Sequence, residues 1–203
     1  MTAIIDYGAG NLHSVQNALA LLGEESEVTG NREKILKADR VILPGVGAFG
    51  DAMERLVDTG LADVVREVAD GGKPLLGICL GLQLMFESSE ENPDVNGLGL
   101  FKGKAVKIPD RGLKIPHMGW NDITVREDSY LLNGLGKEPY VYFVHSYYIQ
   151  PEDESVVSAY TDYGAKLAVA VERDNVAAVQ FHPEKSSSVG MKILKNFIER
   201  EAV

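Results

Sequence analysis

Short apolar runs alternate with amphipathic stretches along roughly the first eighty residues of the chain. Between residues 11 and 23, leucine and valine recur at helical spacing, and we expect Asn11 to cap this helix and Gly23 to end it. Further helical segments are predicted at 32–38, at 51–59 with Asp51 as cap, and at 61–69 after Gly60. Strands are predicted at 2–6, 24–29, 40–43 and 74–78. This alternation indicates parallel strands joined by right-handed crossovers.

The pattern changes after residue 87. Residues 88–99 are polar and glycine-bearing, which predicts a surface loop. Short strand-like pieces follow too closely for helices between them, so we expect an antiparallel or mixed layer. They lie at 104–108, 122–125, 140–144, 155–160, 168–172 and 176–180. Residues 166–180 resemble a hairpin that turns at Asp174 and Asn175, and Ser186 to Ser188 can cap a last amphipathic helix.

Neither a repeat, nor a low-complexity tract, nor a linker interrupts the chain. We therefore expect residues 1–203 to form one α/β domain, which is a common size for a single hydrophobic core. Its central sheet would be mostly parallel and flanked by helices, with the antiparallel or mixed β layer contributed by the second half.

Composition narrows the classes of function. The formal net charge of −10 argues against a nucleic-acid surface and against an anionic membrane, and no apolar run is long enough to span a bilayer. The N-terminus lacks the basic start of a signal peptide. One cysteine cannot form an internal disulfide or a zinc site built on several cysteines, which suits a reducing compartment. We expect a cytoplasmic protein.

The only cysteine, Cys79, lies where the fourth apolar run ends and a helical pattern begins. Gly77 and Gly81 flank it in the spacing of a nucleophile elbow, with cysteine in the place of the more common serine. Glycines suit this position because a sharp strand-to-helix turn leaves little room for side chains. The free N–H groups at a helix start also favour a thiolate.

A cysteine nucleophile needs a base, and His182 is the best candidate. It follows a predicted strand, and Pro183 forces it toward an extended backbone, so that His182 and Glu184 can point to the same side. The carboxylate would hold one ring nitrogen while the other faces Cys79. Acyl transfer also needs oxyanion donors, which the Leu80 N–H and the glycine-rich loop 44–49 can supply.

Simpler interpretations exist for each feature. A lone cysteine is more often a small core residue than a nucleophile, and a histidine two residues before a glutamate is common by chance. The glycines of loop 44–49 can also serve only a tight turn. The functional interpretation is stronger because the features occur together, with Cys79 and His182 at the ends of strands predicted to be neighbours.

Several other motifs are incomplete. Gly8 and Gly10 lack the third glycine of a dinucleotide fingerprint, and residues 97–104 lack features that a P-loop needs. The pair His182 and Glu184 is similar to part of a zinc-deaminase signature, but the cysteines of that signature are missing. We therefore expect neither a metal nor a nucleotide cofactor.

The segments around Cys79, Pro44 to Phe49, and His182 to Glu184 together resemble the class I (triad) glutamine amidotransferases, over nearly the whole chain. The resemblance implies their flavodoxin-like α/β fold and hydrolysis of glutamine to glutamate and ammonia. Cys79 would form a thioester, His182 would carry the proton, and Glu184 would orient His182. The implied oxyanion residues are Val46, Gly47 and Leu80, where the Val46 peptide can flip in this family, and the implied substrate contacts are Gln83, His145, Ser146 and Tyr147.

Finer stretches resemble the glutaminase subunits of imidazole glycerol phosphate synthases. They lie at 6–12, 116–121, 142–147 and 179–186. This resemblance implies a (β/α)8-barrel cyclase subunit as partner, which receives the ammonia and makes imidazole glycerol phosphate in histidine biosynthesis. Its implied partner-facing residues are Asn11, Trp120, Tyr142 and Lys185.

Two alternatives remain open from the sequence. One is a glutaminase that supplies ammonia to another synthase, such as that of anthranilate, purine or pyridoxal phosphate synthesis. The other is a redox or stress protein on a similar fold that uses Cys79 as an oxidation sensor. The pairing of His182 with Glu184 argues against the second alternative.

Overall fold

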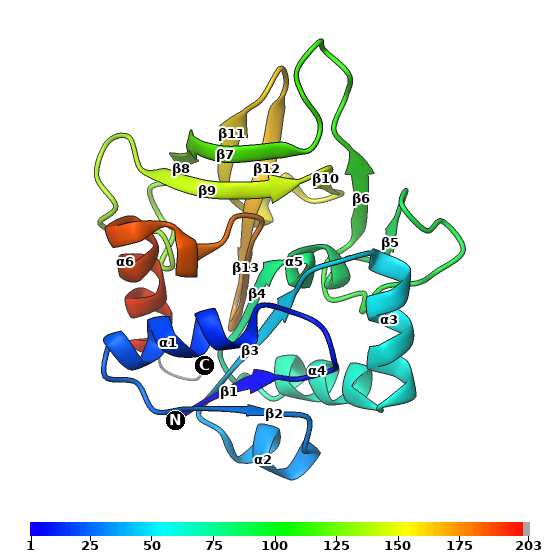
Figure 1. Ribbon diagram of the computed structural model, residues 1–203, viewed down its shortest axis with the longest axis vertical. Coiled ribbons are helices and arrows are strands. Elements are labelled where there is room, and N and C mark those ends of the chain that lie inside the picture. Colours follow the sequence, from blue (N-terminus) through cyan, green and yellow to red (C-terminus); the bar gives the residue numbers. More distant parts are fainter. Residues whose placement is uncertain (201–203) are drawn as a thin grey trace.

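Five parallel strands form the centre of the structure, a computed structural model that describes residues 1–200 (Figure 1). In spatial order they are β2 (Ser26–Thr29), β1 (Thr2–Ile5), β3 (Arg40–Gly45), β4 (Leu75–Cys79) and β13 (Val176–Val179). All residues of β1, β4 and β13 are buried, since helices cover both faces of the sheet. The sequence predicted all five strands, and β4 and β13 are indeed neighbours.

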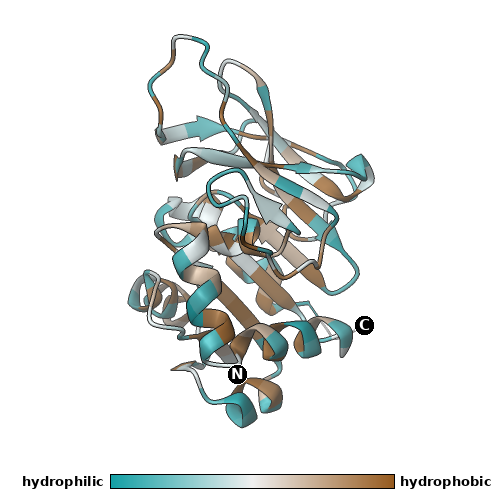
Figure 2. Cartoon of the chain, turned by 90° about the vertical axis from the view of Figure 1, so that its right-hand side faces the viewer, coloured by the Kyte–Doolittle hydropathy of each residue, from teal (hydrophilic) through white to brown (hydrophobic). Residues whose placement is uncertain are grey.

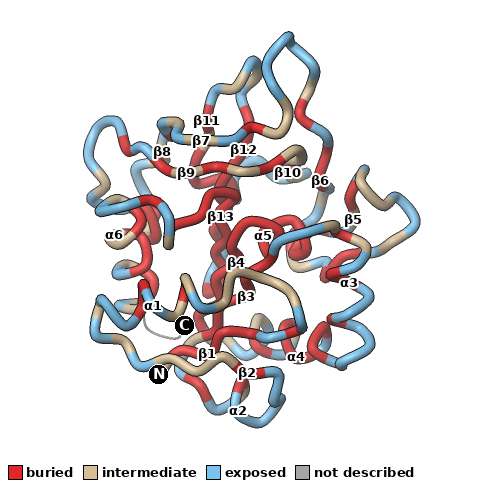
Figure 3. Tube along the Cα trace, viewed as in Figure 1, coloured by how far each residue is buried: buried red, intermediate tan, exposed pale blue. Residues whose placement is uncertain are grey.

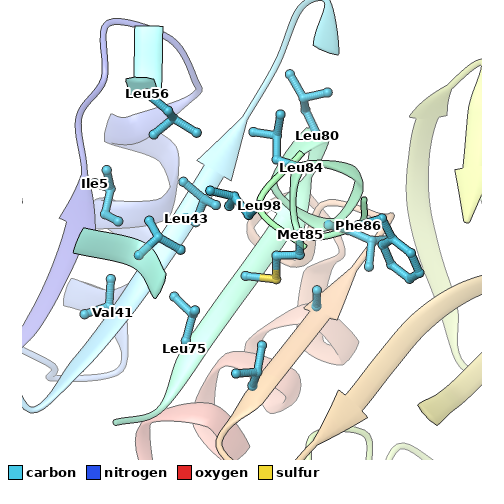
Figure 4. Close-up of a cluster of buried hydrophobic side chains, with 14 of the residues drawn as sticks. Ile5, Val41, Leu43, Leu56, Leu75, Leu80, Leu84, Met85, Phe86 and Leu98 are labelled. Atoms are coloured by element: carbon cyan, nitrogen blue, oxygen red, sulfur yellow. The ribbon is translucent and has the colours of Figure 1, made fainter. Parts of the chain in front are cut away.

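Helices cover the two faces of this sheet unequally. Core residues of α2 (Arg32–Lys37), α3 (Phe49–Asp58), α4 (Leu61–Asp70) and α5 (Leu80–Leu84) pack with Ile5, Leu43 and Leu75 on one face. Figure 4 shows part of this layer, where Leu43 and Leu75 lie near Leu84 and Met85. Core residues of α1 (Leu12–Leu21) and α6 (Ser187–Ile198) pack with Ile4, Ile42 and Leu76 on the other. Apolar residues concentrate on the central strands (Figure 2), whose trace is almost entirely buried (Figure 3).

Further strands continue the same sheet beyond β13. The neighbours in order are β12 (Lys166–Arg173), β10 (Tyr147–Pro151), β6 (Gly103–Lys107) and β5 (Ser88–Ser89), while β11 (Val157–Asp162) pairs with β12 and with β8 (Thr124–Val125). All of them pair antiparallel with their neighbours except β5, which pairs in parallel with β6. The predicted hairpin is confirmed as β12 and β13, with Asp174 at a φ of 53° in its turn. Two 3-10 turns, η1 (Glu154–Val156) and η2 (Pro183–Lys185), complete the elements.

A separate two-stranded sheet pairs β7 (His117–Asp122) with β9 (Tyr140–His145). It crosses the upper part of Figure 1, and β9 contacts both α6 and η2. The sequence analysis missed β5, β7 and β10. The reason is visible in β7, whose less exposed positions carry His117, Gly119 and Asn121 rather than aliphatic residues, so that its alternation is not one of hydrophobicity. The expected class, a largely parallel α/β sheet with added antiparallel strands, is confirmed.

The helix caps differ from those expected. Asn11 occupies the N-cap of α1, but its side chain makes no capping hydrogen bond there, and neither does that of Ser186 at α6. Asp51 lies in the first turn of α3, because that helix begins at Phe49. The first N–H groups of α3 are satisfied from a distant loop, where Glu91 accepts from Phe49 at 2.8 Å and Asn92 from Gly50 at 2.9 Å. Tertiary contacts have replaced the local cap that the sequence predicted.

Within residues 1–200, no helix has the length and apolar character needed to cross a lipid bilayer.

Close approach of β3 and α5 at Gly81 leads to a stability prediction. A Cβ at Gly81 would lie 2.0 Å from the Leu43 carbonyl oxygen, whereas one at Gly71 would come no closer than 3.1 Å to the atoms around it. We expect Gly81→Ala to lower the free energy of unfolding by about 3 kcal/mol or more, and the control Gly71→Ala by less than about 1 kcal/mol. Urea titrations followed by circular dichroism measure both. Equal midpoints for the two variants would contradict the expectation.

Candidate active site

Cys79 lies in a strained backbone conformation at the carboxyl end of β4. Its φ of 56° and ψ of −110° fall where residues other than glycine seldom occur, and α5 begins at the next residue. Close neighbours crowd Gly77 and exclude any side chain at Gly81. A Cβ at Gly77 would lie 3.0 Å from Ala178 and Met85, and one at Gly81 would collide with Leu43. This is the sharp strand-to-helix turn predicted from the glycine spacing, and it presents the Cys79 side chain at the carboxyl ends of the parallel strands.

His182 lies at the same end of the sheet, just after β13, the strand next to β4. Its backbone is extended, and the ring Nδ1 lies 2.8 Å from Glu184 Oε1, as the spacing predicted. The His182 N–H donates to the Tyr142 carbonyl, while the Ser186 hydroxyl donates to the His182 carbonyl at 2.6 Å. Both side chains of the pair are buried, at 2% and 1% exposure. Among the described residues, His182 Nε2 has no hydrogen-bond partner, so it is available to a reacting group.

The surroundings of His182 favour its charged form. Burial by itself lowers the pKa of this imidazole, but the nearby Cys79 sulfur and the Glu184 carboxylate outweigh burial and raise the pKa to about 9. An imidazolium held between a sulfur and a carboxylate is the arrangement that stabilises a cysteine thiolate. The geometry therefore suits nucleophilic catalysis with His182 as proton carrier.

A cavity of about 330 Å³ opens beside Cys79. Its size suits a small metabolite. The predicted residues that line it are Val46, Gly47, Cys79, Leu80, Gln83, His145, Ser146, Tyr147 and His182, and the sequence analysis missed Glu91, Pro116 and Val144. Glu184 does not line this cavity, because it lies behind His182.

The loop that follows β3 forms one wall of the cavity. Val46 is 42% exposed, and Gly47 has a φ of 102° with open space around its α-carbon. The Tyr7 hydroxyl donates to the Pro44 carbonyl at 3.0 Å and so ties this loop to the end of β1. Leu80 lies opposite, as the first residue of α5. Peptide groups from both sides thus border the space next to the Cys79 sulfur, where an oxyanion would form.

Two buried glutamines connect the cavity wall to the sulfur. Gln83 Nε2 donates to the Tyr147 carbonyl at 3.3 Å and to Gln180 Oε1 at 3.1 Å. Gln180 in turn directs its Nε2 toward Cys79 Sγ at 3.9 Å. The sequence analysis did not select Gln180, although a polar residue directly after an apolar strand is a usable signal. Glu91 was missed because residues 88–99 were predicted to be a surface loop.

Three of the four expected partner-facing residues lie together. Trp120 is 53% exposed and packs edge-on against Tyr142, with 6.1 Å between ring centroids, and the Lys185 ammonium lies 5.9 Å from the Tyr142 ring. Asn11 lies elsewhere, at a narrow crevice that it shares with Val46 and Glu184.

Within the described part of the chain, no three histidine, cysteine, aspartate or glutamate side chains gather closely enough to hold a metal ion.

Comparison with known proteins agrees with this geometry. The family described as "Glutamine amidotransferase class-I" matches residues 3–200, so the chain belongs to the class-I glutamine amidotransferases. Imidazole glycerol phosphate synthase subunit HisH of Aquifex aeolicus (strain VF5) is 51% identical, over 97% of this chain and 95% of the relative. HisH of Moorella thermoacetica is 54% identical, over 97% and 93%. Within the class, the chain belongs to the HisH group.

Solved structures show the same fold at lower identity. A "glutamine amidotransferase" crystal structure aligns with a TM-score of 0.77 over 97% of both chains at 23% identity. A chain of "PurLQS from Thermotoga maritima" also aligns with a TM-score of 0.77, over 97% of this chain and 96% of the other, at 21% identity.

The raised pKa of His182 leads to a prediction about pH. The folded state keeps a proton on this ring that the unfolded chain loses above about pH 6.5, so its contribution to stability is complete below that pH. The contribution declines by up to about 1.4 kcal/mol per pH unit as the pH rises toward 9.

Urea unfolding of the native protein and of His182→Gln between pH 6 and 10 measures this effect. We expect the difference in unfolding free energy between them to shrink as the pH rises. Replacement of the exposed His13 by glutamine is the matched control and should leave the native profile unchanged. Parallel profiles for the native protein and His182→Gln would contradict the assignment.

Proposed function

We propose that this protein is the glutaminase subunit of an imidazole glycerol phosphate synthase, with Cys79, His182 and Glu184 as its catalytic residues. The observation that carries the proposal is the placement of Cys79. It lies in a strained elbow, at the same cavity as a buried histidine whose other ring nitrogen is held by a carboxylate. Relatives about half identical over nearly the whole chain are named as HisH subunits of that synthase, which supports the choice within the family.

In this mechanism the Cys79 thiolate attacks the side-chain amide carbon of glutamine. Negative charge develops on the amide oxygen, where the N–H of Leu80 and one from Val46 or Gly47 would receive it. His182 donates its Nε2 proton to the amide nitrogen, and ammonia leaves as the tetrahedral intermediate collapses to a thioester. His182, now neutral, takes a proton from water, and the resulting hydroxide attacks the thioester and releases glutamate and Cys79.

The cavity lining matches the remaining groups of glutamine. Glu91 is the one acidic residue among the lining residues, so its carboxylate is the natural partner for the α-ammonium group. Its Oε2 already accepts from the Phe49 N–H at 2.8 Å, which fixes its position. Gln83, His145, Ser146 and Tyr147 would complete the contacts around the substrate backbone.

The two-stranded sheet offers a surface for the cyclase subunit. Met118, Trp120 and Tyr140 are each at least half exposed on it, which is unusual for large apolar side chains. Together with Tyr142, Lys185 and, at the neighbouring crevice, Asn11, they would face the partner. Val144 lies on β9 and also lines the cavity, so ammonia released at Cys79 would leave close to this surface.

The deciding experiment measures glutamate release from glutamine by the chain alone, and then with the cyclase subunit and its ribonucleotide ligand. Strong stimulation in the complete mixture supports the proposal. If stimulation is absent while a glutamine-mimicking electrophile still alkylates Cys79, the amidotransferase activity stands and another synthase is the partner. Oxidation of Cys79 by peroxide without any glutamine turnover would instead favour the redox sensor.

Cys79→Ala should abolish glutamine hydrolysis in that complete mixture, by at least about 10⁴-fold, because no other residue can form the thioester. Complex formation with the cyclase subunit, measured by size-exclusion chromatography, should remain as in the native protein. Hydrolysis near the native rate would exclude Cys79 as the nucleophile.

Glu184→Gln should be milder than His182→Ala. Glu184 Oε2 has no hydrogen-bond partner among the described residues, so a glutamine can turn its carbonyl oxygen toward His182 Nδ1 and keep that hydrogen bond. It loses the charge and leaves its amide N–H groups without an acceptor. We expect kcat to fall by about 10²-fold for Glu184→Gln and by about 10⁴-fold for His182→Ala. Equal losses would show that the charge of Glu184 matters as much as the imidazole itself.

A further inference from the structure

A chain of hydrogen bonds runs from the small sheet to the cavity wall through two buried histidines. His117 Nδ1 lies 2.9 Å from His145 Nε2, and His145 Nδ1 lies 2.8 Å from the Tyr147 carbonyl oxygen. At the other end, Asn121 Nδ2 lies 3.4 Å from His117 Nε2 and donates to the Asp162 carbonyl at 2.9 Å. His117 and His145 are only 3% and 5% exposed.

The groups at the two ends of this hydrogen-bond chain determine which ring nitrogen of each histidine carries the proton. A carbonyl can only accept, so His145 must carry its proton on Nδ1, and its Nε2 is then the acceptor for a proton on His117 Nδ1. His117 Nε2 is therefore unprotonated and can accept from Asn121. The Asn121 amide cannot reverse, because its Oδ1 accepts from the Asp122 N–H at 3.0 Å. Along the hydrogen-bond chain, each donor therefore points the same way, from β7 toward the cavity.

Burial supports the uncharged state of both rings. It lowers the pKa of His117 to about 4 and that of His145 to about 3, so both are neutral near pH 7. His117 is also stacked between Tyr163 and Phe143, with ring centroids 3.9 Å and 4.6 Å away. Aromatic contacts thus hold the His117 ring in place, and the hydrogen-bond chain orients its two ring nitrogens. The two effects are separable by mutation.

The chain ends on an atom that organises the cavity. The Tyr147 carbonyl accepts from His145 and from Gln83, and Gln83 also donates to Gln180, whose Nε2 points to the Cys79 sulfur. A shift of this carbonyl would therefore move Gln83 within the cavity.

We propose that His117 and Asn121 are positioning residues of the glutamine site: through His145 they hold the Tyr147 carbonyl, and with it Gln83, in the geometry that binds the substrate. This inference rests on the proposed function for its substrate. Neither His117 nor Asn121 lines the cavity, so their effect on glutamine is indirect. Their segment, 116–121, is one whose motif the triad mechanism itself does not use.

Two substitutions at His117 separate the hydrogen bond from the packing. His117→Phe keeps an aromatic ring between Tyr163 and Phe143 but leaves His145 Nε2 without a donor. His117→Asn loses the ring but places an amide N–H close to the position of Nδ1. With the cyclase subunit and its ligand present, we expect His117→Phe to raise KM for glutamine about ten-fold with a smaller change in kcat, and His117→Asn to stay close to native.

His13→Phe is the matched control, because His13 is exposed and takes no part in the hydrogen-bond chain. The same KM for His117→Phe as for the native protein would overturn the proposal. Equally raised KM values for the phenylalanine and asparagine variants would also overturn it, because the ring rather than its N–H would then matter.

The tautomers of His117 and His145 in the native protein test the hydrogen-bond chain without glutamine, and variants serve only to assign the signals. The chain contains four histidines, so ¹⁵N NMR of the ring nitrogens is tractable, and the His13 and His182 variants assign two of the four. We expect His117 and His145 both to be protonated at Nδ1 and unprotonated at Nε2 at pH 7. Protonation at Nε2 of either ring would overturn the proposal. Absence of glutamine hydrolysis by the native complex would refute the proposed function. The tautomers would still show whether the hydrogen-bond chain from Asn121 to the Tyr147 carbonyl exists.

Discussion

The strained turn at Cys79 is the constraint around which the site is arranged. A residue with a side chain adopts a φ of 56° here, where β4, paired with β3 on one side and β13 on the other, turns into α5. Gly81 passes so close to the Leu43 carbonyl that not even a methyl group fits, and β13 flanks β4 on its other side. The cost of this conformation, on the order of 1–3 kcal/mol, is carried by a sheet that is buried on both faces. In return, the sulfur projects from the sheet edge into the cavity.

Electrostatics and burial then act together on the proposed catalytic pair, His182 and Glu184. Both side chains are almost completely buried. Burial alone would lower the pKa of His182, yet the nearby Cys79 sulfur and the Glu184 carboxylate make this imidazole more basic than usual. The two other buried histidines, His117 and His145, show the opposite behaviour, because burial lowers the pKa of each and no carboxylate of the described residues hydrogen-bonds to either ring to offset it. The same residue type is thus the proposed proton carrier in one place and a proposed hydrogen-bond link in another.

Strand β7 joins two parts of the proposed function. Its alternating side chains place Met118 and Trp120 on the exposed side and His117 and Asn121 on the side toward the cavity. The proposed docking face and the hydrogen-bond chain that ends at the Tyr147 carbonyl therefore belong to one strand. A partner bound to β7 would contact the same strand whose His117 and Asn121 are proposed to position the glutamine site.

By itself, the sequence determined the parallel β-α pattern, the elbow at Cys79 and the pairing of His182 with Glu184, because each depends on local spacing and on residues with special backbone preferences. The parallel topology also places the ends of β4 and β13 side by side, so the closeness of Cys79 and His182 could be predicted. Only the tertiary structure decided what long-range contacts control. Glu91 caps a helix that begins 42 residues earlier, and Gln180 turns toward a sulfur on another strand. The tautomer of His117 depends on its contact with His145, 28 residues later, which no local pattern of hydrophobic and polar positions encodes.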